Sequence, residues 1–237
     1  MDSEELKTRA QALRAAGKTP KQIAKALGVT RATVTPLVRG VAVDRPGRKG
    51  PADLPLLGCW ISSGWSAGLI IEDRPADWVD NEDTSPLATA GLVSVAVARR
   101  DGDSASLCGY LVDTYCLGVK NAVPSTALVD EQDLLLFLGD FFSAYDDAPL
   151  RAPIELAQDL VFGAVDFARN LGFDPHRDYY SAAAHLGVWQ PPSRITFGLE
   201  GKPYFQQGPY DNTARVIRTL DRSVGPGNYH FTAVAEL

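Results

Sequence analysis

The first forty positions of the chain carry apolar residues at helical spacing. Leu6, Ala10 and Leu13 fall on one face of a predicted helix over residues 4–16, because neighbours on a helix face recur every three or four positions. Gly17 predicts the end of this helix, since glycine adopts the left-handed conformation at little cost. The chain is therefore expected to begin with a short amphipathic helix.

A second helix is predicted immediately after Thr19. Thr19 is a suitable N-cap, Pro20 fits the first turn, and Gln22 completes a capping box. The apolar face of this helix consists of Ile23, Ala24 and Leu27. Gly28 then favours a tight turn, and Thr30 caps a third helix. This order predicts a helix-turn-helix unit, whose second helix lies in the major groove of DNA.

The expected DNA contacts lie on the second and third helices. The candidate residues are Lys21, Lys25, Thr30, Arg31, Thr33, Thr35 and Arg39. Arg31 and Thr33 are expected to face base edges, because these side-chain types reach bases from the start of a recognition helix. Lys21, Lys25 and Arg39 are expected to contact phosphates.

Pro36 does not fit an uninterrupted third helix. A proline inside a helix removes one backbone hydrogen bond and costs about 3 kcal/mol in an unadapted interior. The third helix is therefore expected to be short or to bend after Thr35. An alternative is a three-helix module that binds a protein partner or another copy of the chain.

Charge is distributed unevenly along the 237 residues. Residues 1–50 hold eleven basic and four acidic side chains, a net charge of +7, whereas residues 51–237 have a net charge of −13. A basic segment attached to an acidic one is typical of a protein that binds a polyanion at one end. Alternatively, the two oppositely charged parts attract each other.

Composition divides the chain into three parts. Residues 1–40 form the predicted head, residues 41–55 a linker with three prolines and two glycines, and residues 56–237 the predicted body. Three basic residues of the linker either follow a phosphate strand or stay solvated: Arg45, Arg48 and Lys49.

The body combines apolar runs typical of strands with longer runs of helical period. Strands are predicted over residues 56–62, 67–71, 91–99, 106–115, 194–197, 203–206 and 228–236. Helices are predicted over residues 130–145, 153–171 and 211–223, the last capped by Asp211. Turn residues predict three strand pairs: 56–62 with 67–71, 91–99 with 106–115, and 194–197 with 203–206. These elements predict an α+β fold, with an antiparallel-sheet body behind a small all-α head.

Several function classes lack their usual sequence signals. The chain shows no signal peptide and no apolar run long enough to span a membrane. Three cysteines without metal-ligand spacing favour reduced thiols in a cytoplasm. Because no nucleophile-elbow, phosphate-loop, zinc or dinucleotide fingerprint is present, we expect no cofactor and no bound metal.

An enzymatic alternative rests on three polar clusters in the body. Six residues are candidates for one catalytic pocket: Asp113, Cys116, Lys120, His176, Asp178 and Lys202. Cys116 is the candidate nucleophile, with a thiolate favoured by Lys120 or His176. His176 and Asp178 are the candidate base and orienting acid. Lys202 is either an anion contact or an ordinary turn residue.

The same residues also admit a metal-based or a structural interpretation. Asp113, His176 and Asp178 are a candidate set of divalent-metal ligands for phosphodiester chemistry. In the structural interpretation Asp178 caps a helix over residues 179–187. Cys116 is then a small buried apolar side chain.

Three strings in the body resemble a family of bacterial proteins. They are LVDTYCLGVK at residues 111–120, GAVDFARNLGFDPHRDY at 163–179 and FGLEGKPYFQQGPYDN at 197–212. The resemblance covers roughly residues 56–235. It implies no catalytic residue, because the family has no established activity. In that family the body occurs with or without an N-terminal helical module, which implies that the body has a role of its own.

Together these patterns predict a bacterial-type, cytoplasmic DNA-binding protein that acts as a transcriptional regulator. Its head is expected to bind duplex DNA, and its body to sense a small-molecule effector or to mediate assembly as a homodimer. The enzymatic alternative is a nuclease or another hydrolase that the head directs to nucleic acid. A third hypothesis is a scaffold whose head binds protein.

Overall fold

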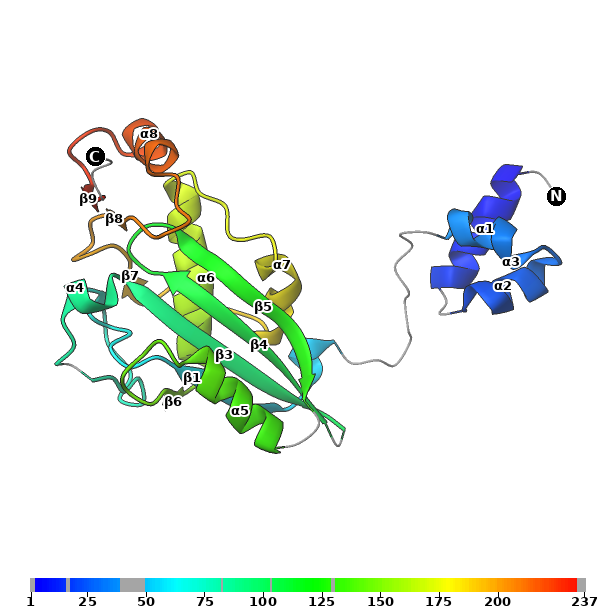
Figure 1. Cartoon of the computed structure of the whole chain (residues 1–237), viewed down its shortest axis with the longest axis horizontal. Coiled ribbons are helices and arrows are strands. Elements are labelled where there is room, and N and C mark those ends of the chain that lie inside the picture. The colour runs from blue at the N-terminus through cyan, green and yellow to red at the C-terminus, as the bar shows by residue number, and fades with distance from the viewer. Residues whose placement is uncertain are drawn as a thin grey trace. The chain divides into compact units, whose positions relative to one another are not determined.

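The computed structural model describes residues 3–15, 18–38, 50–81, 83–102, 104–128 and 131–233. The chain divides into two compact units, Met1–Lys49 and Gly50–Leu237, and each is described by itself (Figure 1). The first unit contains the predicted head. The second contains the body together with residues 50–55, which the composition assigns to the linker.

Three helices of the head enclose a small apolar core. They are α1 (Ser3–Ala15), α2 (Pro20–Leu27) and α3 (Arg31–Leu37). The buried residues of the core are Ala10, Ile23, Ala24, Val34 and Val38. Because α1, α2 and α3 all contribute to this core, each depends on the other two for burial. Gly17, the predicted end of the first helix, lies outside the described residues.

Local capping contacts define the ends of α2 and α3. The Thr19 side chain accepts a hydrogen bond from the Gln22 backbone N–H at 3.4 Å, and the Gln22 side chain accepts one from the Thr19 N–H at 2.8 Å. Gly28 ends α2 with a φ of 67°. The Thr30 hydroxyl accepts from the Thr33 N–H at 3.2 Å. The predicted capping box, glycine turn and threonine cap are confirmed.

Pro36 lies inside α3 and does not end it. The helix continues to Leu37, and the Val38 N–H donates to the Val34 carbonyl at 3.2 Å. With seven residues, α3 is short, which is one of the two outcomes expected from the proline. A short helix limits the stability that the proline costs, because few backbone hydrogen bonds depend on its position.

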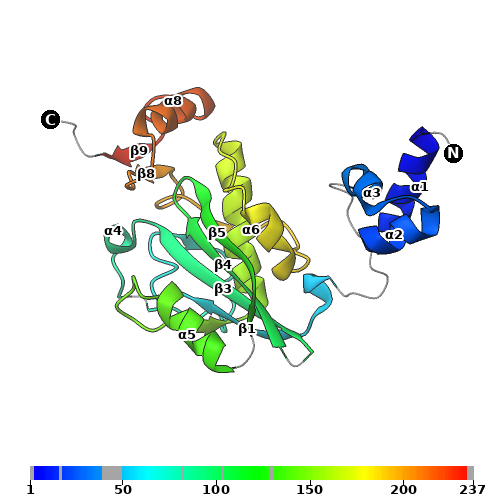
Figure 2. The same ribbon diagram turned by 45° about the vertical axis from the view of Figure 1, so that its right-hand side comes forward.

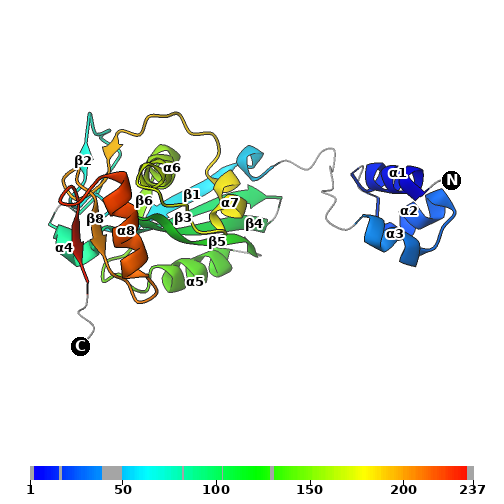
Figure 3. The same cartoon turned by 90° about the horizontal axis from the view of Figure 1, so that it is seen from above.

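A five-stranded antiparallel sheet forms the centre of the body, in the order β5-β4-β3-β1-β6. Its strands are β1 (Leu56–Ile61), β3 (Leu92–Asp101), β4 (Ser104–Asp113), β5 (Gly118–Leu128) and β6 (Leu150–Ala152). Helices α6 (Ile154–Asn170) and α7 (Tyr179–Ala182) lie on one face, and α5 (Glu131–Phe141) lies on the other (Figure 3). These layers confirm the predicted α+β class.

Shorter elements surround the sheet. Strand β2 (Ile70–Ile71) pairs with β7 (Ile195–Thr196) in antiparallel fashion, and β8 (Tyr204–Gln206) pairs with β9 (His230–Thr232) in parallel. Further helical elements are α4 (Pro86–Thr89), α8 (Thr213–Ser223), η1 (Pro51–Asp53) and η2 (Ala183–His185). Elements α8, β8 and β9 gather beyond the end of the sheet at which β4 turns into β5 (Figures 1 and 2).

The central strand β3 is buried on both faces. Val93, Val95 and Val97 belong to the core shared with α6, whereas Ala96 and Ala98 face the α5 side. Burial on both faces explains why apolar residues, interrupted only by Ser94, occupy consecutive positions of residues 92–98 instead of alternating with polar ones. The small alanines let the α5 layer approach the sheet closely.

The predicted pair of residues 91–99 with 106–115 is confirmed, since β3 and β4 form a hairpin. The predicted pair of residues 56–62 with 67–71 is wrong, because β1 pairs with β3 and β6. The Asp80 carboxylate explains the difference. It accepts hydrogen bonds at 2.7 Å from the backbone N–H groups of two residues after β1, Gly64 and Ser66, and so holds this segment in a loop.

The predicted pair of residues 194–197 with 203–206 is also wrong, because β7 pairs with β2 and β8 with β9. The tight turn between them does form. Glu200 and Gly201 have φ values of 52° and 81°, and Leu199 forms an isolated bridge with Lys202. The predicted turn is therefore confirmed, whereas the strands on either side of it pair with segments far away in the sequence.

The apolar pattern predicts neither β5 nor β6. Strand β5 contains Pro124 and Asn121, and its register on β4 shifts twice. It is an edge strand of the sheet, where a proline is tolerated because only one side must pair. Edge strands with such composition lack the alternation from which strands are recognised.

Arg99 joins residues 50–55 to the body. Its guanidinium is buried and donates to the carbonyl of His185 at 2.6 Å, of Leu54 at 2.8 Å and of Ala52 at 3.3 Å. These bonds satisfy both the arginine and three carbonyl groups. The linker prediction for residues 50–55 is corrected accordingly, because this segment is held by a side chain of the central strand.

We expect Arg99→Met to lower the free energy of unfolding by about 3 kcal/mol, since it leaves carbonyl groups without a donor. Residues 50–55 should also become more sensitive to limited proteolysis. Arg100→Met is the matched control, because Arg100 is the exposed neighbour on the same strand. Equal urea-denaturation curves for the two variants would contradict this role of Arg99.

Candidate functional site

The exposed face of α3 carries the predicted base-contacting residues. Arg31, Thr33 and Thr35 are exposed, whereas Val34 points into the core. The hydroxyl of Thr33 lies 2.8 Å from that of Thr30, and the hydroxyl of Thr35 donates to the Arg31 carbonyl at 2.9 Å. These threonine hydroxyls already have partners within the helix, so Arg31 is the principal polar side chain that α3 presents.

Basic side chains also cover the other two helices of the head. In the described range 3–38 the exposed ones are Lys7, Arg9, Lys18, Lys21, Lys25 and Arg31. Lys21 and Lys25 lie one helical turn apart on α2, as expected for residues that follow a phosphate strand. Arg39, the third predicted phosphate contact, lies outside the described residues.

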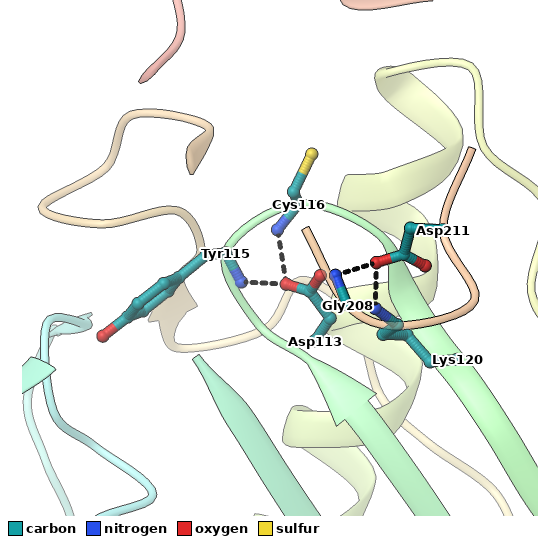
Figure 4. A network of polar contacts seen from close by, with 6 residues as sticks. All are labelled: Asp113, Tyr115, Cys116, Lys120, Gly208 and Asp211. Atoms are coloured by element: carbon teal, nitrogen blue, oxygen red, sulfur yellow. Dashed lines mark hydrogen bonds and ion pairs between the residues drawn. The ribbon is translucent and has the colours of Figure 1, made fainter. Parts of the chain in front are cut away.

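The first polar cluster of the body forms the turn between β4 and β5. The buried Asp113 carboxylate accepts hydrogen bonds from the backbone N–H groups of Tyr115 at 3.0 Å and Cys116 at 2.9 Å (Figure 4). Burial raises the pKa of this carboxyl from 3.8 to about 6, because the ionised form loses its hydration. The positive charge of Lys120 and the N–H donors offset part of this rise in the pKa.

The same turn connects distant segments through Thr114 and Tyr115. The Thr114 carbonyl accepts from the Gly198 N–H at 3.0 Å, and the Tyr115 hydroxyl donates to the Ala67 carbonyl at 2.6 Å. Two glycines with positive φ, Gly68 and Gly91, lie so close to Tyr115 that an added Cβ on either would overlap its side chain. The turn is thereby fixed by contacts from three separate parts of the body.

Lys120 and Asp211 form an ion pair beside this turn. The Lys120 ammonium lies 2.7 Å from the Asp211 carboxylate, which also accepts from the Gly208 N–H at 2.8 Å (Figure 4). The predicted N-cap role of Asp211 is wrong. Asn212 caps α8 instead, because its side chain accepts from the Arg215 N–H at 2.9 Å.

Cys116 has the environment of a structural cysteine. It is fully buried in an apolar cluster with Leu171, Phe205 and Leu220. Its sulfur is turned away from the Asp113 carboxylate (Figure 4). Burial raises the pKa of the thiol well above its ordinary value, and the negative charge of Asp113 adds a smaller rise. The nucleophilic thiolate is therefore disfavoured.

The remaining catalytic candidates, His176, Asp178 and Lys202, form two other contacts elsewhere in the body. The His176 ring nitrogen Nδ1 lies 3.7 Å from an Asp178 carboxylate oxygen, and both side chains are partly exposed. Asp178 occupies the predicted N-cap position of α7, but its side chain makes no capping bond, so the position is confirmed and the side-chain cap is not. The Lys202 ammonium donates to the Gly227 carbonyl at 3.1 Å. The structure thus groups Asp113 and Lys120 and pairs His176 with Asp178 without showing a shared pocket.

The sequence analysis missed a cavity on the α5 face of the sheet. Its volume is about 590 Å³, and Leu92, Leu111 and Phe141 are among the residues that line it. These residues come from segments far apart in the sequence, so no local motif marks them. Within the described ranges, no three His, Cys, Asp or Glu side chains are grouped in a way that would hold a metal ion. The helices described include none that is long and apolar enough to cross a membrane.

Two substitutions at Asp113 separate its hydrogen bonds from its charge. Because its folded-state pKa is raised, the contribution of this carboxyl to stability is largest below about pH 4 and is lost as the pH rises through about 6. Asp113→Asn keeps an acceptor for the two N–H groups and loses this pH dependence. We expect the free energy of unfolding of Asp113→Asn, relative to the unmodified chain, to rise from pH 4 to pH 6.

Asp113→Ala loses the same pH dependence but also leaves two buried N–H groups without an acceptor, so it should be less stable than Asp113→Asn by about 1–3 kcal/mol at every pH. Urea denaturation of both variants and the unmodified chain at each pH measures these differences. A pH-independent difference for Asp113→Asn would show that the carboxyl is not perturbed by burial.

Comparisons with known proteins provide no relative for this chain. No protein-family model, no curated protein and no solved structure matches it. The resemblance of the three body strings to a bacterial family therefore stays a prediction. The function of the protein has to be inferred from the geometry of its own residues.

Proposed function

We propose that the head binds duplex DNA and that the protein is a transcriptional regulator. The observation that carries this proposal is the arrangement of α2, the Gly28 turn and α3. Val34 and Val38 anchor α3 in the core while Arg31 stays exposed near its start. A helix held in this way, after a tight turn, is the part of a helix-turn-helix that enters the major groove.

The chemistry of the exposed side chains supports a division of roles. Arg31 is suited to guanine, because a guanidinium can donate two hydrogen bonds to its edge. Lys21 and Lys25 supply charge along α2 for phosphates. Thr30, Thr33 and Thr35 have their hydroxyls engaged within α3, so their share in base recognition is smaller than that of Arg31.

The shortness of α3 favours a dimer on DNA. A seven-residue helix presents few side chains to the groove, and helix-turn-helix proteins commonly gain affinity by binding two half-sites as dimers. We therefore propose a homodimer assembled through the body, acting on DNA in a bacterial cytoplasm. The body is acidic, and its charge would disfavour DNA contacts outside the head.

The hydrolase alternative draws less support from the same geometry. Cys116 is buried in an apolar cluster and Lys120 is paired with Asp211. Asp113 directs its carboxylate to backbone N–H groups of its own turn. Each of these contacts stabilises the fold, and a catalytic group would need access to substrate.

Fluorescence anisotropy across a salt series tests DNA binding by the full chain. We expect Lys25→Ala to weaken binding to all duplexes and to reduce the slope of log K against log salt by about one unit. Arg31→Ala should in addition cost about 1–3 kcal/mol on a preferred sequence and relax the preference.

Arg100→Ala is the control for these variants, because it removes one positive charge from an exposed position in the body. It should leave both the affinity and the salt slope unchanged. If the full chain shows no salt-dependent binding to any duplex, the head is not a DNA-binding module and the protein-binding hypothesis takes its place.

Light scattering tests the proposed assembly. We expect a mass of twice that of the chain at micromolar concentration, either in the free protein or on a duplex with two half-sites. A monomer under both conditions would reject the homodimer while leaving DNA binding by the head intact.

A further inference from the structure

The α5 face of the sheet is covered along only part of its length. Gly109 gives α5 room to approach, because an added Cβ there would lie 2.7 Å from the Phe141 ring. Leu138 and Phe142 likewise pack closely over another small residue of the sheet, Ala96. Since α5 ends at Phe141, it does not cover the sheet beyond this row, where the short helix α4 contributes Ala88 and Thr89 to the lining of the cavity.

The next row across the sheet forms the floor of the cavity of about 590 Å³. It consists of Ser94, Leu111 and Asn121, which are register partners on β3, β4 and β5. Leu92 extends the apolar part of this floor, and Phe141 contributes a wall. The cavity volume lies within the range of sites that bind small organic molecules.

The wall that follows α5 is held in place by its own contacts. The Tyr145 hydroxyl donates to the Ser94 hydroxyl at 3.1 Å, and the Tyr145 ring lies 6.3 Å from the ring of Phe142. Contacts within the body therefore hold this wall in place, and a ligand would not have to order it on binding.

The charged residues that line the cavity are all acidic. Among the residues that the structure describes they are Asp146 and Asp147, both exposed at the rim, and none of these lining residues is a lysine or arginine. Asp147 accepts a hydrogen bond from the Asn81 side chain at 3.3 Å, which fixes its direction. The apolar part of the floor, Leu92 and Leu111, below a negative rim complements a molecule with a hydrocarbon body and one positive end, and the rim disfavours anions.

We propose that this cavity is a binding site for a small organic amine. The hydrocarbon part of the ligand lies on Leu92, Leu111 and Phe141, and its ammonium group lies toward Asp146 and Asp147. This site belongs to the body alone and does not depend on DNA binding by the head.

Calorimetric titration of the full chain, without DNA, tests the site with three probes of similar size. Phenethylamine is positively charged at neutral pH, phenethyl alcohol is neutral and phenylacetate is negative. We expect affinity to fall in that order. Replacing both rim acids, Asp146→Asn with Asp147→Asn, should weaken binding of the amine by about three- to tenfold and leave the alcohol unchanged.

Two matched controls keep the test specific. Asp140→Asn removes an exposed carboxylate of α5 that does not line the cavity and should change nothing. Ala144→Trp places a large ring at the exposed wall and should abolish binding of both amine and alcohol, whereas Ser143→Trp next to it should not. The proposal is overturned if none of the probes binds, if phenylacetate binds as well as the amine, or if Ala144→Trp binds normally.

Discussion

The hydrogen bonds from the turn backbone to the Asp113 carboxylate determine how one end of the body is assembled. A buried carboxylate is costly, and here two N–H donors and the charge of Lys120 offset part of that cost. The shape they give the turn places Tyr115 and Thr114 where the segments around Ala67 and Gly198 can bond to them. The loops at this end would lack a common attachment point without that turn.

The head could be predicted almost completely from the sequence, because its signals are local. The side chain of Thr19 and that of Gln22 act on backbone groups three residues away, and such contacts are visible in the sequence itself. The α+β class of the body followed from similar local patterns. Of the strand pairs, only the β3–β4 hairpin followed from them. The pair of residues 56–62 with 67–71 did not form, because Asp80, sixteen residues after Gly64, converts the predicted hairpin turn into a loop.

The polar clusters of the body show a different limit of sequence analysis. The density of polar residues around Asp113 and Lys120 was recognisable, yet it did not distinguish a catalytic group from a carboxylate that binds backbone N–H groups. That distinction depends on burial and partners, such as the pairing of Lys120 with Asp211 across 91 residues. The cavity beside α5 left no signal at all, because its floor is a row across three strands and its rim belongs to another segment.

The packing of Tyr115 against Gly68 and Gly91 has a consequence for how this sequence can change over evolution. The positive φ of both glycines and the tyrosine side chain beside them exclude a larger residue at positions 68 and 91 for two separate reasons. Replacing the tyrosine by a small side chain removes only one of these reasons. In a diverging lineage the tyrosine at position 115 would therefore be substituted before either glycine.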